Sequence, residues 1–505
     1  MERKTEPIYT PTVCFDGYLE ESLDGEIRLA DYYPDAQEIL KIETPVFVTE
    51  GKISGDKVKI DGTLLFRVCY ASQEGNRLGS VSLPLPFSKT FEAKKLLPTD
   101  GVAETTATVR YKNARLINAR RISVAAAVGL SVTVKGKTAH EYLIPADGEF
   151  EYETKEITVG NYIGSSEREQ KISEEFPLPE GKPNINLIVR YDTFATLTDV
   201  RTITNKAVLK GDVTLRLLYL TENNEPEHLE YSVPVTQILE REGLDEKTAI
   251  HAFFSVSQSR VEPLTGQNGE TNAVKLEATV SAHLEGYERK QITVCTDAFS
   301  PQYDAELKKS RIPSTELIDT LTLEQPFRDT LEYSAGEVER ICDLWGTVSA
   351  ATVEQTADGF MVSAEVELTV LAYDRDGRLC SVDSTIPVKA DIRLPDSENL
   401  RVTPLLVLSD ISYTMTGENL IEVRGTVRVI SRITKETSVE VIADILPSDT
   451  PKQSDRPPFA VYYASEGERV WDIAKAHNAR VGDILRDNGL DGDIVRENRI
   501  LRLFC

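Results

Sequence analysis

The side chains that most often carry chemistry in proteins are few in this sequence, and they are scattered. The 505 residues include five histidines, at His140, His228, His251, His283 and His477. No two of them stand at a metal-ligand spacing on a common face of an expected element. We therefore predict no metal site. We expect His283, on the polar side of its strand, to face solvent.

The cysteines point to plain reduced thiols. They lie at Cys14, Cys69, Cys295, Cys342, Cys380 and Cys505. No two form a C-x-x-C pair, so neither a zinc site nor a disulfide framework is indicated. The terminal Cys505 is the exception, because an exposed thiol at a chain end can react. The sequence leaves open whether it crosslinks.

The charge balance excludes some classes of partner. Acidic residues number 82 and basic residues 57, a net charge of −25. Such a chain repels nucleic-acid phosphates and anionic lipids, so we expect no nucleic acid and no direct membrane insertion. The N-terminus lacks the apolar core of a signal peptide, and the apolar stretch Val124–Val132 is too short to span a bilayer. The sequence therefore predicts a cytosolic address.

No catalytic constellation emerges from the carboxylates either. Pairs such as Glu149–Glu151 and Glu174–Glu175 lie in or beside acidic stretches, where a solvated charged surface is the expected role. The sequence contains neither a G-x-S-x-G turn nor a phosphate-binding loop. We predict no catalytic residue, no cofactor and no enzyme activity. A hydrolase with an unrecognised site is the alternative, which an esterase and glycosidase screen would test.

The elements that surround these residues repeat along the chain. The segments 57–70, 206–219 and 360–373 alternate between apolar and polar residues, which is typical of a half-buried strand. Gly62 and Gly211 take the same position in the first two, which favours a close backbone approach or a local twist over phosphate binding. Tyr70 and Tyr219 end the same two strands. We expect them to pack at the edge of a core, and ligand contact is the alternative.

Two further features recur with the same period of about 150 residues. Alternating segments at 121–134, 273–284 and 421–430 follow the first set by about 60 residues. Between them lies a strand with a proline, at Pro86, Pro234 or Pro387, which indicates a sheet edge or a bulge. We expect Trp345 to fill the core of the third repeat, with an interface role as the alternative.

The fold class that satisfies this pattern is mainly β. Alternating strands bury one face per sheet, so two sheets must cover each other in an antiparallel sandwich. We predict three tandem sandwich-like repeats, at 22–147, 170–300 and 322–447. We expect separate beads on short linkers, with the acidic stretch 149–160 among those linkers. A proline-rich and polar linker is predicted at 448–458.

The last segment, 460–505, has a different pattern. Its expected order is strand, helix, helix, strand, with Val470, Ile473 and Ala474 on the buried face of the first helix. Asn488-Gly489 is expected to end the second helix as a left-handed cap.

This tail resembles the LysM domain. The residues that carry the resemblance are Tyr462, the run Gly467–Ala474, Val481, Ile484, Asn488 and Leu490. In LysM domains that bind N-acetylglucosamine polymers, the groove lies between the loop before the first helix and the loop after the second, here 465–469 and 488–492. The predicted partner- or glycan-binding residues are therefore Gly467, Arg469, Trp471, Asn488 and Leu490. Glu468-Arg469 departs from the usual Asp-Thr pair, and packing within the tail is the alternative role of Trp471.

The order of parts resembles the SipL family of spore-coat morphogenetic proteins, whose repeats are called SPOCS domains. The segment Val58–Tyr70, followed by the strand with Pro86, is the most telling repeat marker. The resemblance implies a non-enzymatic scaffold in the mother-cell cytoplasm, at the forespore surface. There the LysM domain would dock on a SpoIVA-like coat ATPase, alongside other coat proteins. The alternative is a protein anchored on peptidoglycan through N-acetylglucosamine polymers.

Overall fold

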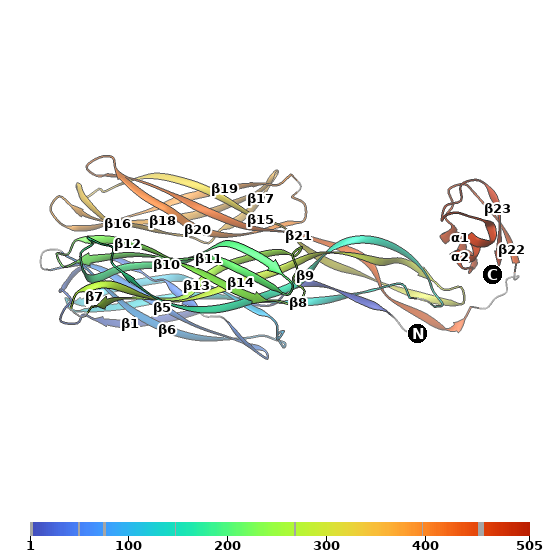
Figure 1. Cartoon of the computed structure of the whole chain (residues 1–505), viewed down its shortest axis with the longest axis horizontal. Helices are drawn as coiled ribbons and strands as arrows, with labels where there is room; N and C mark the ends of the chain where they lie inside the picture. The colour runs from blue at the N-terminus through green and yellow to red at the C-terminus, as the bar shows by residue number, and fades with distance from the viewer. Residues whose placement is uncertain are drawn as a thin grey trace.

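The computed structural model describes residues 4–504 except 49–50, 74–76, 147, 267–268, 396 and 453–458. The described chain is mostly antiparallel β structure, with two short helices near its C-terminal end (Figure 1). The predicted fold class, mainly β, is confirmed. Cys505 and residues 453–458 of the predicted linker 448–458 lie outside the described residues. The prediction is wrong for 448–451, which continue the last strand of the third repeat. In the described part, no helix is long and apolar enough to cross a membrane.

Repeat 1 is built from two facing sheets. One has the order β1-β8-β7, and in the other β2, β3, β4 and β6 all pair with β5. Val58 and Leu64 of β5 meet Val124 and Leu130 of β8 in a shared core. The strands are β1 (Thr5–Arg28), β2 (Ala36–Glu43), β3 (Val46–Val48), β4 (Lys52–Ser54), β5 (Lys57–Ser72), β6 (Leu78–Glu92), β7 (Val102–Asn118) and β8 (Arg121–Leu143).

Repeats 2 and 3 follow the same plan. Their sheet orders are β13-β14-β9 with β10-β11-β12, and β15-β21-β20 with β16-β18-β17, where β19 also pairs with β18. The strands of repeat 2 are β9 (Glu151–Pro177), β10 (Ile185–Ile203), β11 (Lys206–Thr221), β12 (Pro226–Glu240), β13 (Ala249–Thr265) and β14 (Thr271–Phe299). Those of repeat 3 are β15 (Tyr303–Glu332), β16 (Val338–Val348), β17 (Thr352–Thr356), β18 (Gly359–Asp374), β19 (Leu379–Arg393), β20 (Leu400–Met415) and β21 (Leu420–Pro451).

The predicted features of the repeats recur at matching places in the sheets. Pro86 pairs with Thr63, Pro234 with Asp212 and Pro387 with Glu365, each on a strand that pairs only on one side. The predicted edge position of these prolines is therefore confirmed. A Cβ on Gly211 would lie 2.1 Å from the carbonyl oxygen of Thr196, which is the close backbone approach expected there.

The expected linker between repeats 1 and 2 is wrong. Residues 149–160 belong largely to β9, and β9 pairs with β14 from Pro177 back to Glu151. Val159 is buried while its neighbours Glu156 and Thr158 are exposed, so this part of the stretch alternates as a strand does. The many charged residues of this stretch obscure the short alternation of buried and exposed positions in the sequence. Each repeat also begins earlier than its predicted range, at Thr5, Glu151 and Tyr303.

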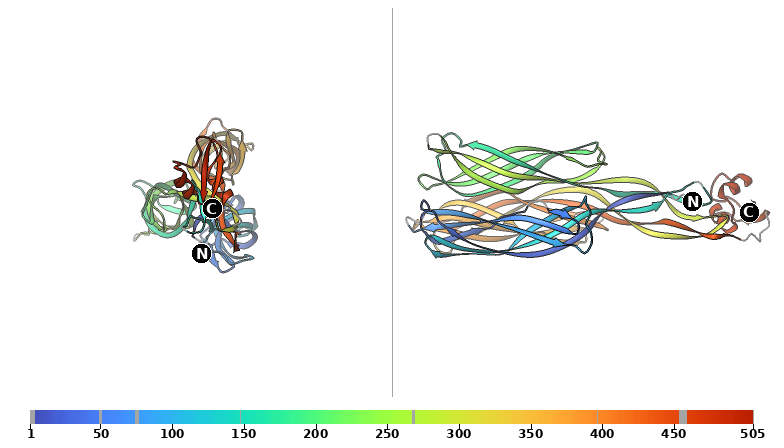
Figure 2. Two further views of the ribbon diagram at one scale, coloured as in Figure 1. Left: turned by 90° about the vertical axis from the view of Figure 1, so that its right-hand side faces the viewer. Right: turned by 90° about the horizontal axis from the view of Figure 1, so that it is seen from below.

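The first and last strands of each repeat extend beyond their sandwich as a two-stranded ribbon. The three ribbons run side by side to the right of the sandwiches in Figure 1 and in the right-hand view of Figure 2. They share a core that includes Ile8, Val159, Ile292, Ile312 and Val441. We call this part the stalk, with paired segments 5–12/136–143, 151–162/287–299 and 303–317/434–451. The three sandwiches together form the head.

The three sandwiches pack around a common centre, seen end-on in the left-hand view of Figure 2. Cys69 of repeat 1, Leu218 of repeat 2 and Leu371 of repeat 3 belong to one buried cluster, which also includes Trp345. The expectation of separate beads is therefore wrong. Trp345 sits in this shared cluster and not in the core of repeat 3, so its interface alternative holds. Alternation within a strand shows which face is buried but not which repeat covers it.

Candidate functional site

The tail folds as strand, helix, helix and strand. Its elements are β22 (Phe459–Ala464), α1 (Val470–His477), α2 (Val481–Asn488) and β23 (Arg499–Phe504). The two strands pair antiparallel, and Val470, Ile473 and Ala474 of α1 are buried in the tail core as expected. Asn478 and Gly489 end the helices in left-handed conformation, with φ of +53° and +59°. The sequence order therefore folds locally as predicted.

Gly467 and Arg469 lie in the loop before α1. Gly467 has a φ of +90°, and its N–H donates to the carbonyl oxygen of Val495 at 2.8 Å. The guanidinium of Arg469 binds the carboxylate of Glu153, at the stalk end of β9. It also lies 3.4 Å from a carboxylate oxygen of Asp493. Arg469 thus joins the tail to repeat 2.

Trp471 fills the tail core and also contacts the stalk. It is 5% exposed, and its ring meets the Phe299 ring edge-on at 5.0 Å. The indole N–H donates to the carboxylate of Asp297 at 3.0 Å, and Lys475 binds the same carboxylate at 2.6 Å. Burial alone would raise the pKa of Asp297, but the Lys475 and Trp471 hydrogen bonds outweigh it and hold that pKa below its usual value. Trp471 therefore serves packing and docking within the chain together.

Asn488 and Leu490 lie at the other end of the tail. The amide of Asn488 donates to the carbonyl oxygens of Ile484 and Arg502, and accepts from the Arg502 N–H at 2.7 Å. It thereby ties the end of α2 to β23. Leu490 packs partly buried against the tail core. In the described chain, no hydrogen bond or ion pair joins these two residues to Gly467, Arg469 or Trp471, so the predicted site divides into two sets.

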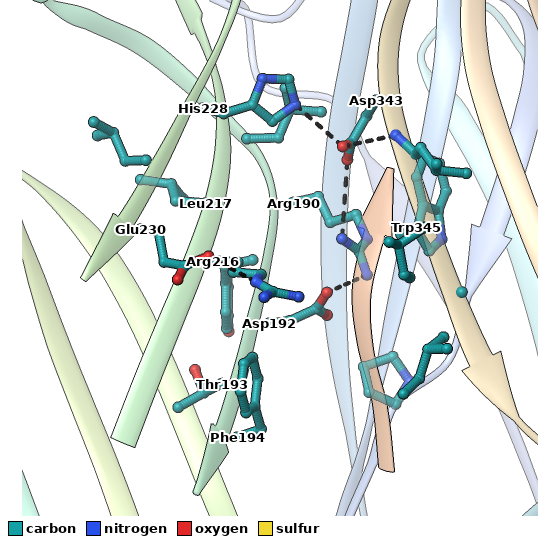
Figure 3. A pocket seen from close by; sticks show the side chains of 18 of the residues that line it. Arg190, Asp192, Thr193, Phe194, Arg216, Leu217, His228, Glu230, Asp343 and Trp345 are labelled. Atoms are coloured by element: carbon teal, nitrogen blue, oxygen red, sulfur yellow. Dashed lines mark hydrogen bonds and ion pairs between the residues drawn. The ribbon is translucent and has the colours of Figure 1, made fainter. Parts of the chain in front are cut away.

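A second cluster of charged side chains lies at the centre of the head. Glu43 of repeat 1 accepts one hydrogen bond from Arg67 and one from Arg190 of repeat 2, each at 2.8 Å. Arg190 also binds Asp192, lies 3.9 Å from Asp343 of repeat 3, and covers the Trp345 ring at 4.8 Å (Figure 3). We call this set the central network. It connects all three repeats.

The central network borders a cavity of about 930 Å³ that is lined mainly by repeats 2 and 3. His228 lies 3.1 Å from Asp343, and Arg216 binds Glu230 at 2.8 Å (Figure 3). The charged side chains drawn at this cavity are thus paired with one another across or along strands. This arrangement is that of a structural ion network. The sequence offers no signal for it, because its members come from three repeats.

A third charged group joins the repeats where the head meets the stalk. Glu285 of repeat 2 binds Lys135 of repeat 1 at 3.3 Å and Arg432 of repeat 3. His251 lies beside them, and burial, with Arg432 nearby, lowers its pKa to about 4. His283 hydrogen-bonds Ser255 at 2.9 Å and stacks on Phe253. The His283 side chain is only 22% exposed, so the prediction that it faces solvent is wrong, and its burial lowers its pKa to about 4.

The cysteines and possible metal ligands are scattered over the described residues. That part of the chain contains no group of three or more His, Cys, Asp or Glu side chains that could hold a metal ion. Cys14, Cys69, Cys295, Cys342 and Cys380 are all unbonded thiols. Burial raises the pKa of both Cys69 and Cys342 to about 12, which keeps them protonated and unreactive. Tyr70 and Tyr219 are buried and donate to the carbonyl oxygens of Pro34 and Pro183, as packing residues do.

Comparison with protein-family models gives a match in repeats 1 and 2. The SipL, SPOCS domain model matches residues 35–117, which run from β2 into β7, and residues 151–263, which run from β9 into β13. This match supports a SipL-like protein. SipL proteins form a non-enzymatic sporulation family, so the chain is sporulation-related. Searches of curated proteins and of solved structures found no match.

Proposed function

We propose that the chain is a scaffold without catalytic activity in the assembly of the bacterial endospore coat. It acts in the mother-cell cytoplasm, at the forespore surface. Its tail is a LysM domain that docks on a SpoIVA-like coat morphogenetic ATPase, while the head contacts other coat proteins. The sporulation family of repeats 1 and 2 supports the setting.

The observation that carries the scaffold proposal is the position of the tail. It lies at the far end of the stalk, away from the head (Figure 1). A stalk segment such as 287–299 spans roughly 40 Å at about 3.3 Å per residue. The tail can therefore engage one partner while the head is held at a distance from it. A protein that connects two layers needs this separation.

Glycan binding is the rival for the tail, and the docked geometry favours a protein partner. The groove edge expected to hold N-acetylglucosamine units includes Arg469 and Trp471. Both side chains are engaged by Glu153 and Asp297 of the stalk. A glycan in that groove would have to compete with these contacts.

A co-purification experiment tests the proposal. The full chain and a chain ending at Lys452 are each mixed with the purified SpoIVA-like ATPase of the same organism, and in parallel with purified peptidoglycan. We expect the full chain to bind the ATPase, the shortened chain to lose that binding, and neither to sediment saturably with peptidoglycan. Saturable sedimentation of the full chain, lost on removal of the tail, would favour the glycan rival.

A further inference from the structure

The outer face of the β22–β23 ribbon is apolar, and none of the described residues covers it. Along each strand, alternate residues point away from the helices, while Leu501 and Leu503 on the inner face are fully buried. The strand register places Phe459 opposite Phe504, and Tyr463 opposite Ile500. We call this surface the outer tail face. Its apolar members, between 46% and 66% exposed, are Phe459, Val461, Tyr463, Ile500 and Phe504.

The area of the outer tail face exceeds what scattered surface residues contribute. Aromatic side chains present about 150–250 Å² each when fully exposed, so the five residues together offer on the order of 500 Å². The largest apolar patch on a typical monomer is about 300–600 Å² and often functional. One partner in a standard protein interface contributes about 800 Å², including a polar rim. The outer tail face has the size of the apolar centre of such an interface.

One positive charge lies within this apolar surface. Arg502 pairs with Val461 across the ribbon and shares the outward side of β23 with Ile500 and Phe504. Within the described residues, its guanidinium makes no hydrogen bond or ion pair, because its contacts with Asn488 use the backbone. Tyrosine, phenylalanine and arginine are the side chains enriched at the centre of protein interfaces. If a partner buries this guanidinium, an acceptor must replace its water, and a carboxylate is the strongest acceptor that a protein can supply.

We propose that the outer tail face binds a partner protein that presents an apolar segment with one carboxylate placed against Arg502. The inference rests on the proposed function and names the surface by which the tail docks. The loop groove is already in contact with the stalk through Arg469 and Trp471, which leaves the outer tail face as the large apolar surface of the tail that is free.

Charge favours a different protein over a second copy of this chain. Two copies would bring together net charges of −25 each. A two-fold contact uses the same patch on both molecules, so Arg502 would also approach its own counterpart. The outward residues of the ribbon include no carboxylate, so a two-fold contact centred on them would leave Arg502 without one. A partner with an acidic side chain in an apolar segment meets both requirements.

Titration of the full chain with the purified SpoIVA-like ATPase tests this assignment. Tyr463→Ser and Arg502→Glu are each expected to weaken binding by about tenfold or more, as loss of a central interface residue does. Arg502→Lys keeps the charge and is expected to retain most of the affinity. The matched controls are Arg480→Glu, on the helical side of the tail, and Leu96→Ser, an exposed leucine of repeat 1. Both controls should bind like the unaltered chain.

The outcomes separate this inference from the proposed function. If the unaltered chain does not bind the ATPase, the proposed function fails and this inference with it. If the unaltered chain binds and the Tyr463 and Arg502 variants bind equally well, the surface is wrong while the proposed function stands. Sedimentation velocity of the chain alone completes the test. Dimer formation that Tyr463→Ser abolishes would assign the surface to a second copy and overturn the proposed partner.

Discussion

Replacing Glu43 by glutamine should loosen the head more than any surface charge substitution. The Glu43 side chain is 13% exposed, and its two oxygens accept hydrogen bonds from Arg67 and Arg190, which are 3% and 10% exposed. Glu43→Gln preserves the shape but removes the charge that both guanidiniums face. Breaking a buried ion pair by removing one partner costs about 3–5 kcal/mol. Since Arg190 keeps Asp192 and Asp343, we expect the lower end, about 3 kcal/mol.

Urea unfolding followed by Trp345 fluorescence measures this loss. The chain contains two tryptophans, so a Trp471→Phe background leaves Trp345, which contacts Arg190, as the reporter. With a slope of about 3 kcal/mol per molar urea, a loss of about 3 kcal/mol moves the midpoint down by about 1 M. The control is Glu26→Gln, because Glu26 pairs with Arg28 and Arg121 on the surface. A midpoint for Glu43→Gln equal to that of the control would refute the reasoning.

The pH dependence of the stability difference between the parent chain and Glu43→Gln gives a second test, because the direction of the change is fixed by the charge argument. Burial alone would raise the pKa of Glu43, but Arg190 and Arg67 outweigh it and hold that pKa below its usual value. A carboxyl group with a lower pKa in the folded state stabilises the fold at pH values above its unfolded pKa. This stabilisation is lost as the pH falls through the folded pKa. The difference between the parent and Glu43→Gln should therefore be full at neutral pH and shrink in acid below about pH 4. A difference that is constant from pH 7 to pH 3 would contradict the charge argument.

Three further outcomes are expected. Asp297→Asn removes the stalk carboxylate, so the tail should undock and the fluorescence of Trp471 should shift to the red; an unchanged spectrum would contradict the docking contact. His251 has a folded pKa of about 4, so the free energy of unfolding should fall by up to ~3 kcal/mol as the pH drops from about 6.5 to 4. This fall should be smaller in a His251→Leu chain. Gly79→Ala should lower the thermal midpoint of unfolding, because the added Cβ would lie 2.3 Å from the buried ring of Tyr70. Gly482 lies in α2 with open space around it, so Gly482→Ala should stabilise the tail by about 0.5–1 kcal/mol.

Local patterns in the sequence predict what each strand does within its own repeat. The alternation of 57–70 and 206–219 marks buried faces, and proline marks edge strands such as the one with Pro86, because both effects depend on neighbours along one strand. The tail is predictable for the same reason, since its helix periodicity and its caps are local signals.

Contacts between repeats are not predictable in this way. Glu43, Arg190 and Asp343 each look like surface charges in their own strand, and only the packing of three repeats brings them together. The stretch 149–160 has the composition of a linker, because its charges are dense and its buried positions few. Arg469 lies in the loop expected before the first helix and Trp471 lies on that helix, but nothing in the sequence around them indicates that Glu153 and Asp297, more than 170 residues away, would engage them.

The fusion of the repeats changes how the scaffold would work. Separate beads on flexible linkers would raise affinity by presenting several similar faces at high effective concentration. In the observed head, Cys69, Leu218 and Leu371 are buried against one another and so are lost as binding surface. The head therefore offers its contacts at fixed relative positions, and the stalk sets their distance from the tail. Spacing between partners, and not the number of independent binding faces, is then what the three repeats provide. Lengthening or shortening the paired ribbons would change the separation of head and tail without altering either contact surface.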